Sequence, residues 1–160
     1  MRMVKTKRKR KPYSERNDLE RIRSNWRKIE GLYHKGEWSS VVIRSATATE
    51  IAINLVIREE LANKRKLEKD FVESLLIWAN GIQGKVNRLI RPLLTNPEDT
   101  RVFRDLSSMI NDINNERNSV AHSGQFKRKT TAIKIVNSSK EVIETLVGRY
   151  KGNFELKDIL

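Results

Sequence analysis

The sequence predicts an all-α protein, an antiparallel bundle of about five helices. Apolar residues recur at spacings of three and four along most of the chain, which is the period of one helix face. No segment shows sustained strand alternation with hairpin turns, and the connections between helical segments are short, as in a bundle. A chain of 160 residues is long enough for one domain with a core. We therefore expect one helical domain at 14–150, between a basic arm at 1–13 and a tail at 151–160.

The basic arm is the most charged part of the chain. Residues 1–16 carry eight basic side chains and one acidic side chain, and the whole protein has a formal net charge of +13. Such an excess favours polyanionic partners, chiefly nucleic acid, or an acidic protein. The arm has almost nothing to bury, so we expect it to be disordered on its own. It is either a solvated tail that aids solubility or a phosphate-binding segment that uses Lys7, Arg8, Lys9, Arg10 and Lys11.

The first two helices are predicted at residues 15–34 and 37–63. Ser14 is the candidate N-cap of the first helix, and His34 is expected at its C-terminal end, where a charged imidazole is favourable. The second helix is apolar on most sides, so it should be the central helix of the bundle. A narrow polar seam interrupts it, formed by Arg44, Thr47, Glu50, Asn54 and Arg58.

The remaining helices are predicted at residues 68–94, 97–122 and 125–150. Gly81 and Gly84 weaken the middle of the first of these three, so we expect it to bend or break there. Asn96 as N-cap and Gly124 just past the C-terminus bound the next one. Each tryptophan lies on a helical apolar pattern, and we expect all three in the core rather than as base-stacking platforms: Trp26, Trp38 and Trp78.

Arg117, Asn118 and His122 are the residues that best indicate chemistry. Their helix has an apolar stripe on which Arg117 is the next position, so the arginine falls on the face that the helix would bury. A buried arginine needs a partner or a ligand, because a desolvated unpaired charge costs several kcal/mol. Asn118 and His122 continue a second stripe, alongside Asn111 and Asn115.

The spacing of these three residues resembles the R-N-x-x-x-H signature of the HEPN superfamily. The resemblance covers roughly residues 14–150 and leaves out the basic arm. Members of that superfamily are small helical bundles, and many are metal-independent ribonucleases of toxin–antitoxin, phage-defence and RNA-processing systems. The resemblance implies a homodimer in which the two motif helices face each other across a composite cleft. It also implies RNA products with 2′,3′-cyclic phosphate and 5′-hydroxyl ends.

The residue types themselves suit this chemistry. Cleavage of RNA without a metal needs the 2′-hydroxyl deprotonated, the phosphate charge stabilised and the 5′-oxygen protonated. Histidine transfers protons near neutral pH, and the planar guanidinium offers several fixed donors to a phosphate. Asn118 can orient either group or hold a phosphate oxygen. One chain offers one plausible catalytic histidine for two proton transfers, so a two-fold dimer would supply the second.

Glu50 is the fourth candidate catalytic residue. It is the natural seam residue to pair with Arg117 or to help position His122. Alternatively, it pairs with Arg44, Asn54 or Arg58 at the protein surface or at a dimer interface.

Alternatives from other functional classes stay open. Arg117 can simply pair with Glu50 or Glu116, with His122 as a helix cap. The protein would then be an inactive HEPN-like module that binds RNA, a nucleotide or a partner protein, or a basic DNA-binding or scaffold protein without a site. An antitoxin or regulatory protein is a further expected partner of the nuclease.

Composition limits the other classes. The chain has no cysteine and two well-separated histidines, so we expect no disulfide, no thiolate chemistry, no structural zinc and no cofactor. No uncharged apolar run approaches about 18 residues, and no apolar segment follows the basic N-terminus. We therefore expect neither a membrane span nor a secretory signal, and a cytoplasmic location.

Overall fold

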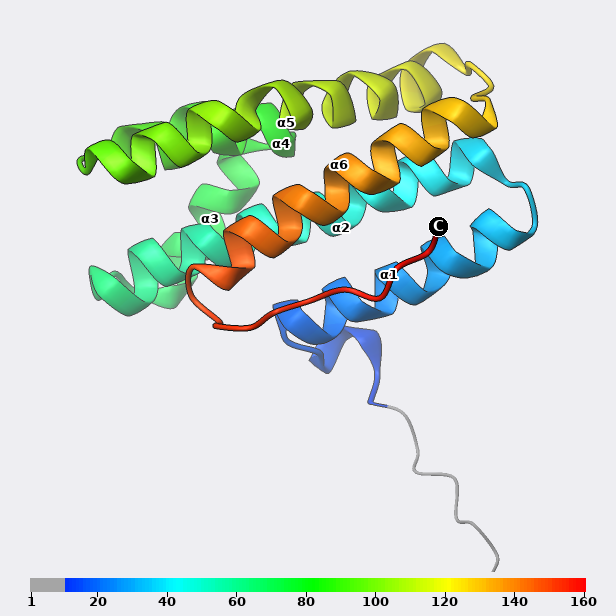
Figure 1. Cartoon of the computed structure of the whole chain (residues 1–160). Helices are drawn as coiled ribbons and strands as arrows, with labels where there is room; N and C mark the ends of the chain where they lie inside the picture. The colour runs from blue at the N-terminus through cyan, green and yellow to red at the C-terminus, as the bar shows by residue number, and fades with distance from the viewer. Residues whose placement is uncertain (1–10) are drawn as a thin grey trace, which may run out of the picture.

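The protein is an all-α bundle, as the sequence predicts. The computed structural model describes residues 11–160, and none of these residues forms a β-strand (Figure 1). In chain order the helices are α1 (Asp18–His34), α2 (Trp38–Arg58), α3 (Lys69–Ala79), α4 (Gly81–Lys85), α5 (Pro97–Ser123) and α6 (Lys129–Gly148). Short π-helical turns at Glu59–Lys64 and Val86–Ile90 extend α2 and α4, and 3-10 turns lie at Tyr13–Glu15 and Arg91–Leu93. The predictions made for residues 1–10, including a disordered arm, lie outside the described residues.

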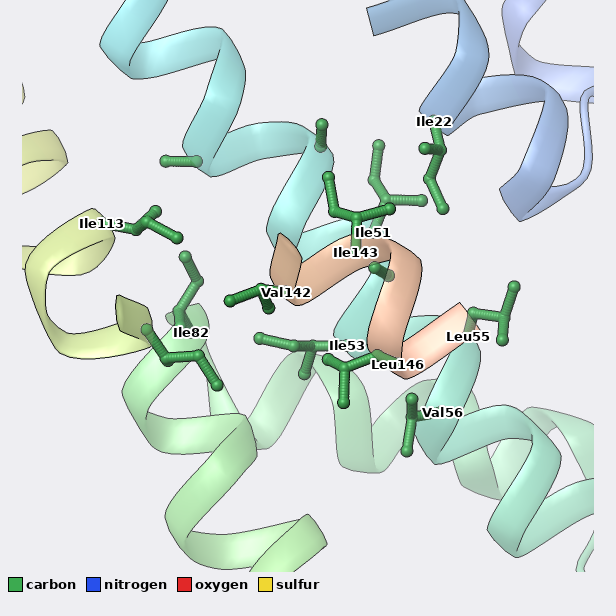
Figure 2. Packing of buried hydrophobic residues seen from close by; sticks show 14 of the residues in the cluster. Ile22, Ile51, Ile53, Leu55, Val56, Ile82, Ile113, Val142, Ile143 and Leu146 are labelled. Carbon is green, nitrogen blue, oxygen red and sulfur yellow. The ribbon is translucent and has the colours of Figure 1, made fainter. Parts of the chain in front are cut away.

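The central helix is α2, which confirms the prediction from its composition. It packs against α1, α5 and α6, and Figure 2 shows its side chains interleaved with those of the neighbouring helices. Trp38–Lys64 is long and apolar enough to cross a membrane, yet 67% of its most apolar window is buried inside the bundle. A helix that is apolar all round is also what the core of a soluble bundle requires.

The N-terminus of α1 differs from the prediction. Its N-cap is Asn17 rather than Ser14, which lies in the preceding 3-10 turn. The Oδ1 of Asn17 accepts a bond from the backbone N–H of Glu20 at 2.9 Å, and Oε2 of Glu20 accepts one from the N–H of Asn17 at 2.8 Å. This reciprocal pair satisfies two helix-terminal donors at once, whereas a lone serine would satisfy one.

The predicted helix at 68–94 is broken at Asn80 and Gly81, which have φ angles of 28° and 72°. The break separates α3 from α4, as the two glycines suggest. A side chain on Gly84 would collide with the carbonyl oxygen of Ala79, so the close approach of the two helices requires a glycine there. The break also turns α3 outward, and Trp78 is 59% exposed. The prediction of a core position for Trp78 was therefore wrong.

The last two helices meet at a loop that fixes the end of α5. The Oδ1 of Asn96 accepts a bond from the N–H of Glu98 at 2.8 Å, and Gly124 adopts φ 62° at the other end of α5, so both predicted caps are confirmed. The helix α6 begins at Lys129, four residues later than predicted. The backbone N–H of Lys127 is bound by Oγ of Ser39 at 2.9 Å and so takes no part in a helix.

The C-terminal segment returns along the bundle beside α6 and α1 (Figure 1). Phe154 and Leu156 are buried in the core. The indole N–H of Trp26 donates to the carbonyl of Lys157 at 2.8 Å, so Trp26 is buried as predicted. Trp38 is half-buried, with its ring edge-on to Tyr33 at 5.3 Å between centroids.

Candidate functional site

Arg117, Asn118 and His122 meet at the C-terminal end of α5. The Nη1 of Arg117 donates a hydrogen bond to Oδ1 of Asn118 at 3.0 Å. The same nitrogen lies 3.3 Å from Nε2 of His122. Residues five positions apart point in different directions around a helix, so the contact depends on the long side chain of Arg117. We call these three residues the α5 cluster.

The contact between Arg117 and His122 has one direction. A guanidinium only donates hydrogen bonds, so Nε2 of His122 is the acceptor. A neutral imidazole can take a proton from a hydroxyl, once the arginine N–H has turned from Nε2 to another acceptor.

Arg117 lies at the edge of the buried face rather than deep within it. Arg117 and Asn118 are half-buried, and His122 is exposed. No carboxylate among residues 11–160 pairs with Arg117, because both acids that could have done so bind lysines. Glu116 pairs with Lys127 at 2.6 Å, and Glu50 pairs with Lys85 at 2.5 Å. The guanidinium thus keeps donors that can bind an anion.

Glu50 has a different partner from every one proposed above. It binds neither Arg117 nor His122, and it binds none of the polar residues of its own helix. Its carboxylate instead accepts a bond from the ammonium of Lys85 on α4. The pairing predicted for Glu50 was therefore wrong, as was the alternative. The physical reason is that α4 brings a lysine against α2 at this level, and the side chain of Lys85 is only 8% exposed, so its charge requires a counter-ion.

Glu50 and Arg117 nevertheless line the same cavity, which has a volume of about 150 Å³. Thr47 from α2, Gly81 at the start of α4 and Asn114 from α5 also line it. Ligand pockets for small molecules typically exceed about 300 Å³, so this cavity is too small for a nucleotide.

Sequence reasoning missed Lys85, although a signal was present. Ile82 and Leu89 are buried residues of the same segment, and Lys85 lies three residues after one and four before the other. A lysine at that position of an apolar stripe is buried unless the helix turns. Its pattern thus indicated a buried cation, but not which acid would meet it.

Contacts of Lys127, which the sequence did not reveal, hold the loop after the α5 cluster in place. The ammonium of Lys127 pairs with Glu116, and the backbone of Lys127 binds Ser39 at the start of α2. The side chain of Lys127 is only 11% exposed. Glu116 therefore pairs with a residue of the following loop and not with its chain neighbour Arg117.

Lys11 is the one predicted phosphate-binding residue that the structure describes, and it does not lie at the α5 cluster. Lys7, Arg8, Lys9 and Arg10 lie outside the described residues. Lys11 is at the N-terminal end of α1, where its ammonium is 3.4 Å from Glu20. The loop after α5 instead contacts the N-terminal end of α2, beside the C-terminal end of α1 (Figure 1). The 17 residues of α1 span roughly 25 Å, so Lys11 and the cluster lie at opposite ends of the bundle.

The largest hollow, about 570 Å³, lies elsewhere, between α1, α2 and α3. Arg58 lines it and forms bidentate bonds with Asp18 and with Glu73 at 2.7 to 2.9 Å. Hydrogen bonding to Glu73 is the main cause that raises the pKa of Arg58, and the same bond lowers the pKa of Glu73. Because Arg58 is already bound to two carboxylates, its guanidinium offers less to an anion than that of Arg117 does.

Among residues 11–160, no group of three or more His, Cys, Asp or Glu side chains is placed to hold a metal ion. No family model, no curated protein and no solved structure matches the chain. The α5 cluster is therefore interpreted from its own geometry and from the short motif that it carries.

Proposed function

We propose that this protein is a metal-independent endoribonuclease in which Arg117 and His122 act at a homodimer cleft. The observation that carries the proposal is the α5 cluster itself. A guanidinium with no carboxylate partner among residues 11–160 lies 3.3 Å from an exposed imidazole. These are an anion-binding group and a proton-accepting group within reach of one phosphodiester.

The proposed reaction begins when a phosphate oxygen takes the N–H of Arg117 that now faces His122. Nε2 of His122 is then free to remove the proton of the 2′-hydroxyl, and the 2′-oxygen attacks the phosphorus. Arg117 stabilises the charge on the equatorial oxygens, and Asn118 keeps the guanidinium in place. The bond from phosphorus to the 5′-oxygen breaks, and His122 of the partner subunit, which enters the reaction in its protonated form, donates its proton to that oxygen. The products are a 2′,3′-cyclic phosphate and a 5′-hydroxyl.

The dimer is proposed because two proton transfers need two proton carriers. The other histidine of this chain, His34, is the last residue of α1 and contacts the ring of Tyr33 edge-on at 6.0 Å between centroids. That is the helix-end position predicted for it, and a favourable helix-end charge accounts for it. The HEPN resemblance supports the same arrangement. It also supports a cytoplasmic toxin or defence effector that is controlled by an antitoxin or regulatory protein.

The proposal is tested by incubating the purified protein with total RNA in excess EDTA. Wild type should cleave the RNA and leave cyclic phosphate ends. His122→Ala and Arg117→Ala should each lower the rate by about 10² to 10⁴-fold, as expected for a lost proton carrier or charge stabiliser. The matched control is His34→Ala, which should cleave at the wild-type rate. Equal loss in all three variants, or cleavage only with added metal, would contradict the proposal.

An inactive RNA-binding module is the second candidate, and one observation favours it. In a single copy, Nε2 of His122 is already occupied by Arg117, an arrangement that can serve structure alone. Such a module would bind RNA without cleaving it in the same assay. Binding that falls on Arg117→Ala would then identify the α5 cluster as its anion site.

A further inference from the structure

The loop between α5 and α6, residues 124–128, is held at both ends. Gly124 closes α5 in the left-handed conformation, and the N–H of Gln125 returns to the carbonyl of Ser119 at 3.1 Å. On the far side, Lys127 is bound through its backbone to Ser39 and through its ammonium to Glu116. The residue between these two anchors is Phe126, so its position follows from fixed neighbours on each side.

Phe126 is 95% exposed, more than any other large apolar side chain in residues 11–160. A large aromatic ring gains stability from burial, and this chain has a well-filled core that leaves Phe126 out. It follows Gly124 by two residues and His122 by four. Four residues extend over at most about 14 Å, so the Cα atoms of Phe126 and His122 lie within that distance of each other.

Two cations that follow Phe126 closely in the sequence have no acidic partner among residues 11–160. Arg128 and Lys129 are exposed, and neither forms an ion pair with any residue of the described chain. The ammonium of Lys129 is 5.9 Å from the centre of the Trp38 ring. An exposed aromatic beside unpaired cations is the combination that binds single-stranded nucleic acid, in which bases stack on rings and phosphates meet the charges.

We propose that Phe126 is a stacking platform for one unpaired base of the substrate, with Arg128 and Lys129 binding the phosphates beside it. This inference rests on the proposed function for its RNA substrate, and it specifies that substrate as single-stranded at the cleavage site. A protein interface is a less suitable occupant. The centre of such an interface is depleted of charge and especially of lysine, whereas Phe126 is followed directly by three cationic residues.

The test is binding of a fluorescent single-stranded oligonucleotide of about 12 nucleotides, carrying 2′-O-methyl groups that prevent cleavage. Wild type, Phe126→Ala and Phe126→Trp are compared by anisotropy. Phe126→Ala should weaken binding about 5- to 100-fold, the loss typical of one stacked base, and Phe126→Trp should bind within about threefold of wild type. The matched control is Phe71→Ala, which removes an exposed phenylalanine on α3 and should bind as wild type does.

Salt dependence separates stacking from charge. Phe126→Ala should leave the slope of the logarithm of affinity against the logarithm of salt concentration unchanged. The double variant Arg128→Ala/Lys129→Ala should reduce the magnitude of this slope by about 1.4, or about 0.7 for each phosphate contact. The effect of Phe126→Ala should be absent on a duplex of the same sequence, whose bases are already stacked.

Four results would overturn this inference. They are no binding by wild type, undiminished binding by Phe126→Ala, equal loss on the duplex, and a change of oligomeric mass in Phe126→Ala, which would make the ring a subunit contact. Failure of the proposed function is a separate result. Wild type that binds through Phe126 but never cleaves RNA refutes the nuclease, whereas cleavage and binding that ignore Phe126 refute the platform alone.

Discussion

Charge pairing decides what Arg117 can do. Its two acidic neighbours, Glu50 and Glu116, are held by Lys85 and Lys127. Glu116 adjoins Arg117 in the chain, and Glu50 lines the same cavity as Arg117, so we expect a carboxylate that has lost its lysine to compete for the arginine. Each lysine thus acts on the α5 cluster through a carboxylate, without touching the arginine. This is a positioning role, and it is open to a direct test.

Replacing Lys85 should affect both stability and cleavage. Lys85→Met leaves Glu50 without a cation, which we expect to cost about 2 kcal/mol, below the usual range for a broken buried pair because the Glu50 side chain is 33% exposed. Arg117 should then turn to Glu50, and RNA cleavage should fall about tenfold or more.

The double variant Glu50→Gln/Lys85→Met serves as the control. Removing the unpaired carboxylate should restore cleavage if Lys85 acts by withholding Glu50 from Arg117. Urea unfolding and cleavage rates of the two single variants and the double variant form the measurement. A double variant as slow as Lys85→Met would show that Glu50 itself takes part in the reaction.

The elements position the site through two close approaches. At one, α4 turns back against the end of α3 so that its lysine reaches α2. At the other, the loop after α5 is fastened to α2 by Ser39 and Lys127. The first depends on the break between α3 and α4, and the second on the loop at residues 124–128. The break at Asn80 and Gly81 is therefore part of the site's architecture, since a continuous helix there would carry Lys85 elsewhere.

Gly84 provides the test of the first approach. Gly84→Ala should destabilise the protein by about 1 to 3 kcal/mol through overpacking, because its Cβ would meet the Ala79 carbonyl, which is backbone and cannot rotate away. Gly148→Ala is the matched control, since nothing lies within 4 Å of a Cβ there, and it should be neutral or slightly stabilising. Chemical denaturation of both variants gives the comparison, and equal midpoints would argue against the packing described.

A further contact between elements, formed by Glu60, makes the stability of the fold depend on pH. Burial alone would raise the pKa of Glu60, but hydrogen bonds from Lys64, Tyr150 and Arg65 outweigh it and lower the pKa from 4.5 to about 2. A carboxyl group whose pKa is lowered by folding stabilises the folded state at pH values above its unfolded pKa. This stabilisation is lost as the pH falls from about 4.5 towards 2. The loss amounts to about 3 kcal/mol at about 1.4 kcal/mol for each pH unit.

We therefore expect Glu60→Gln to be clearly less stable than wild type at pH 7, with the gap narrowing below pH 4.5. The measurement is the free energy of unfolding in urea at several pH values between 7 and 3. A gap that stays constant across this range would show that the charge of Glu60 is not what joins the end of α2 to Tyr150.

At the scale of the whole molecule, the chain is a compact bundle with a strongly positive charge and a candidate site at one end. The net charge of +13 favours polyanions at long range whatever the site does. It also opposes self-association, so a dimer must bury enough surface to overcome that repulsion. Salt should weaken RNA binding and strengthen dimer formation, which makes the two separable.

The proposed dimer predicts a particular dependence on concentration. Light scattering should give twice the chain mass of 18.7 kDa, and activity per chain should fall on dilution below the dimer dissociation constant. At higher salt, the fall in activity per chain should begin at a lower protein concentration, because screening of the positive charge strengthens the dimer. Activity that stays proportional to protein at every dilution, with a monomeric mass, would exclude a site shared between two subunits.

How much of this could be predicted from the sequence depends on the range of the interaction. The all-α class, the central place of α2 and the caps at Asn96 and Gly124 all follow from residue types and spacing along single helices. Such relations need only the helical period. The sequence also contained the Asn17 cap and the buried position of Lys85, although we did not infer them.

The tertiary structure alone decided the partner of Glu50, the outward turn of Trp78, the fastening of Lys127 and the exposure of Phe126. Each depends on how far one helix is shifted and rotated against another. The period of a helix says which residues share a face, but it leaves that shift and rotation free. They are set by packing of the whole core, to which every element contributes at once.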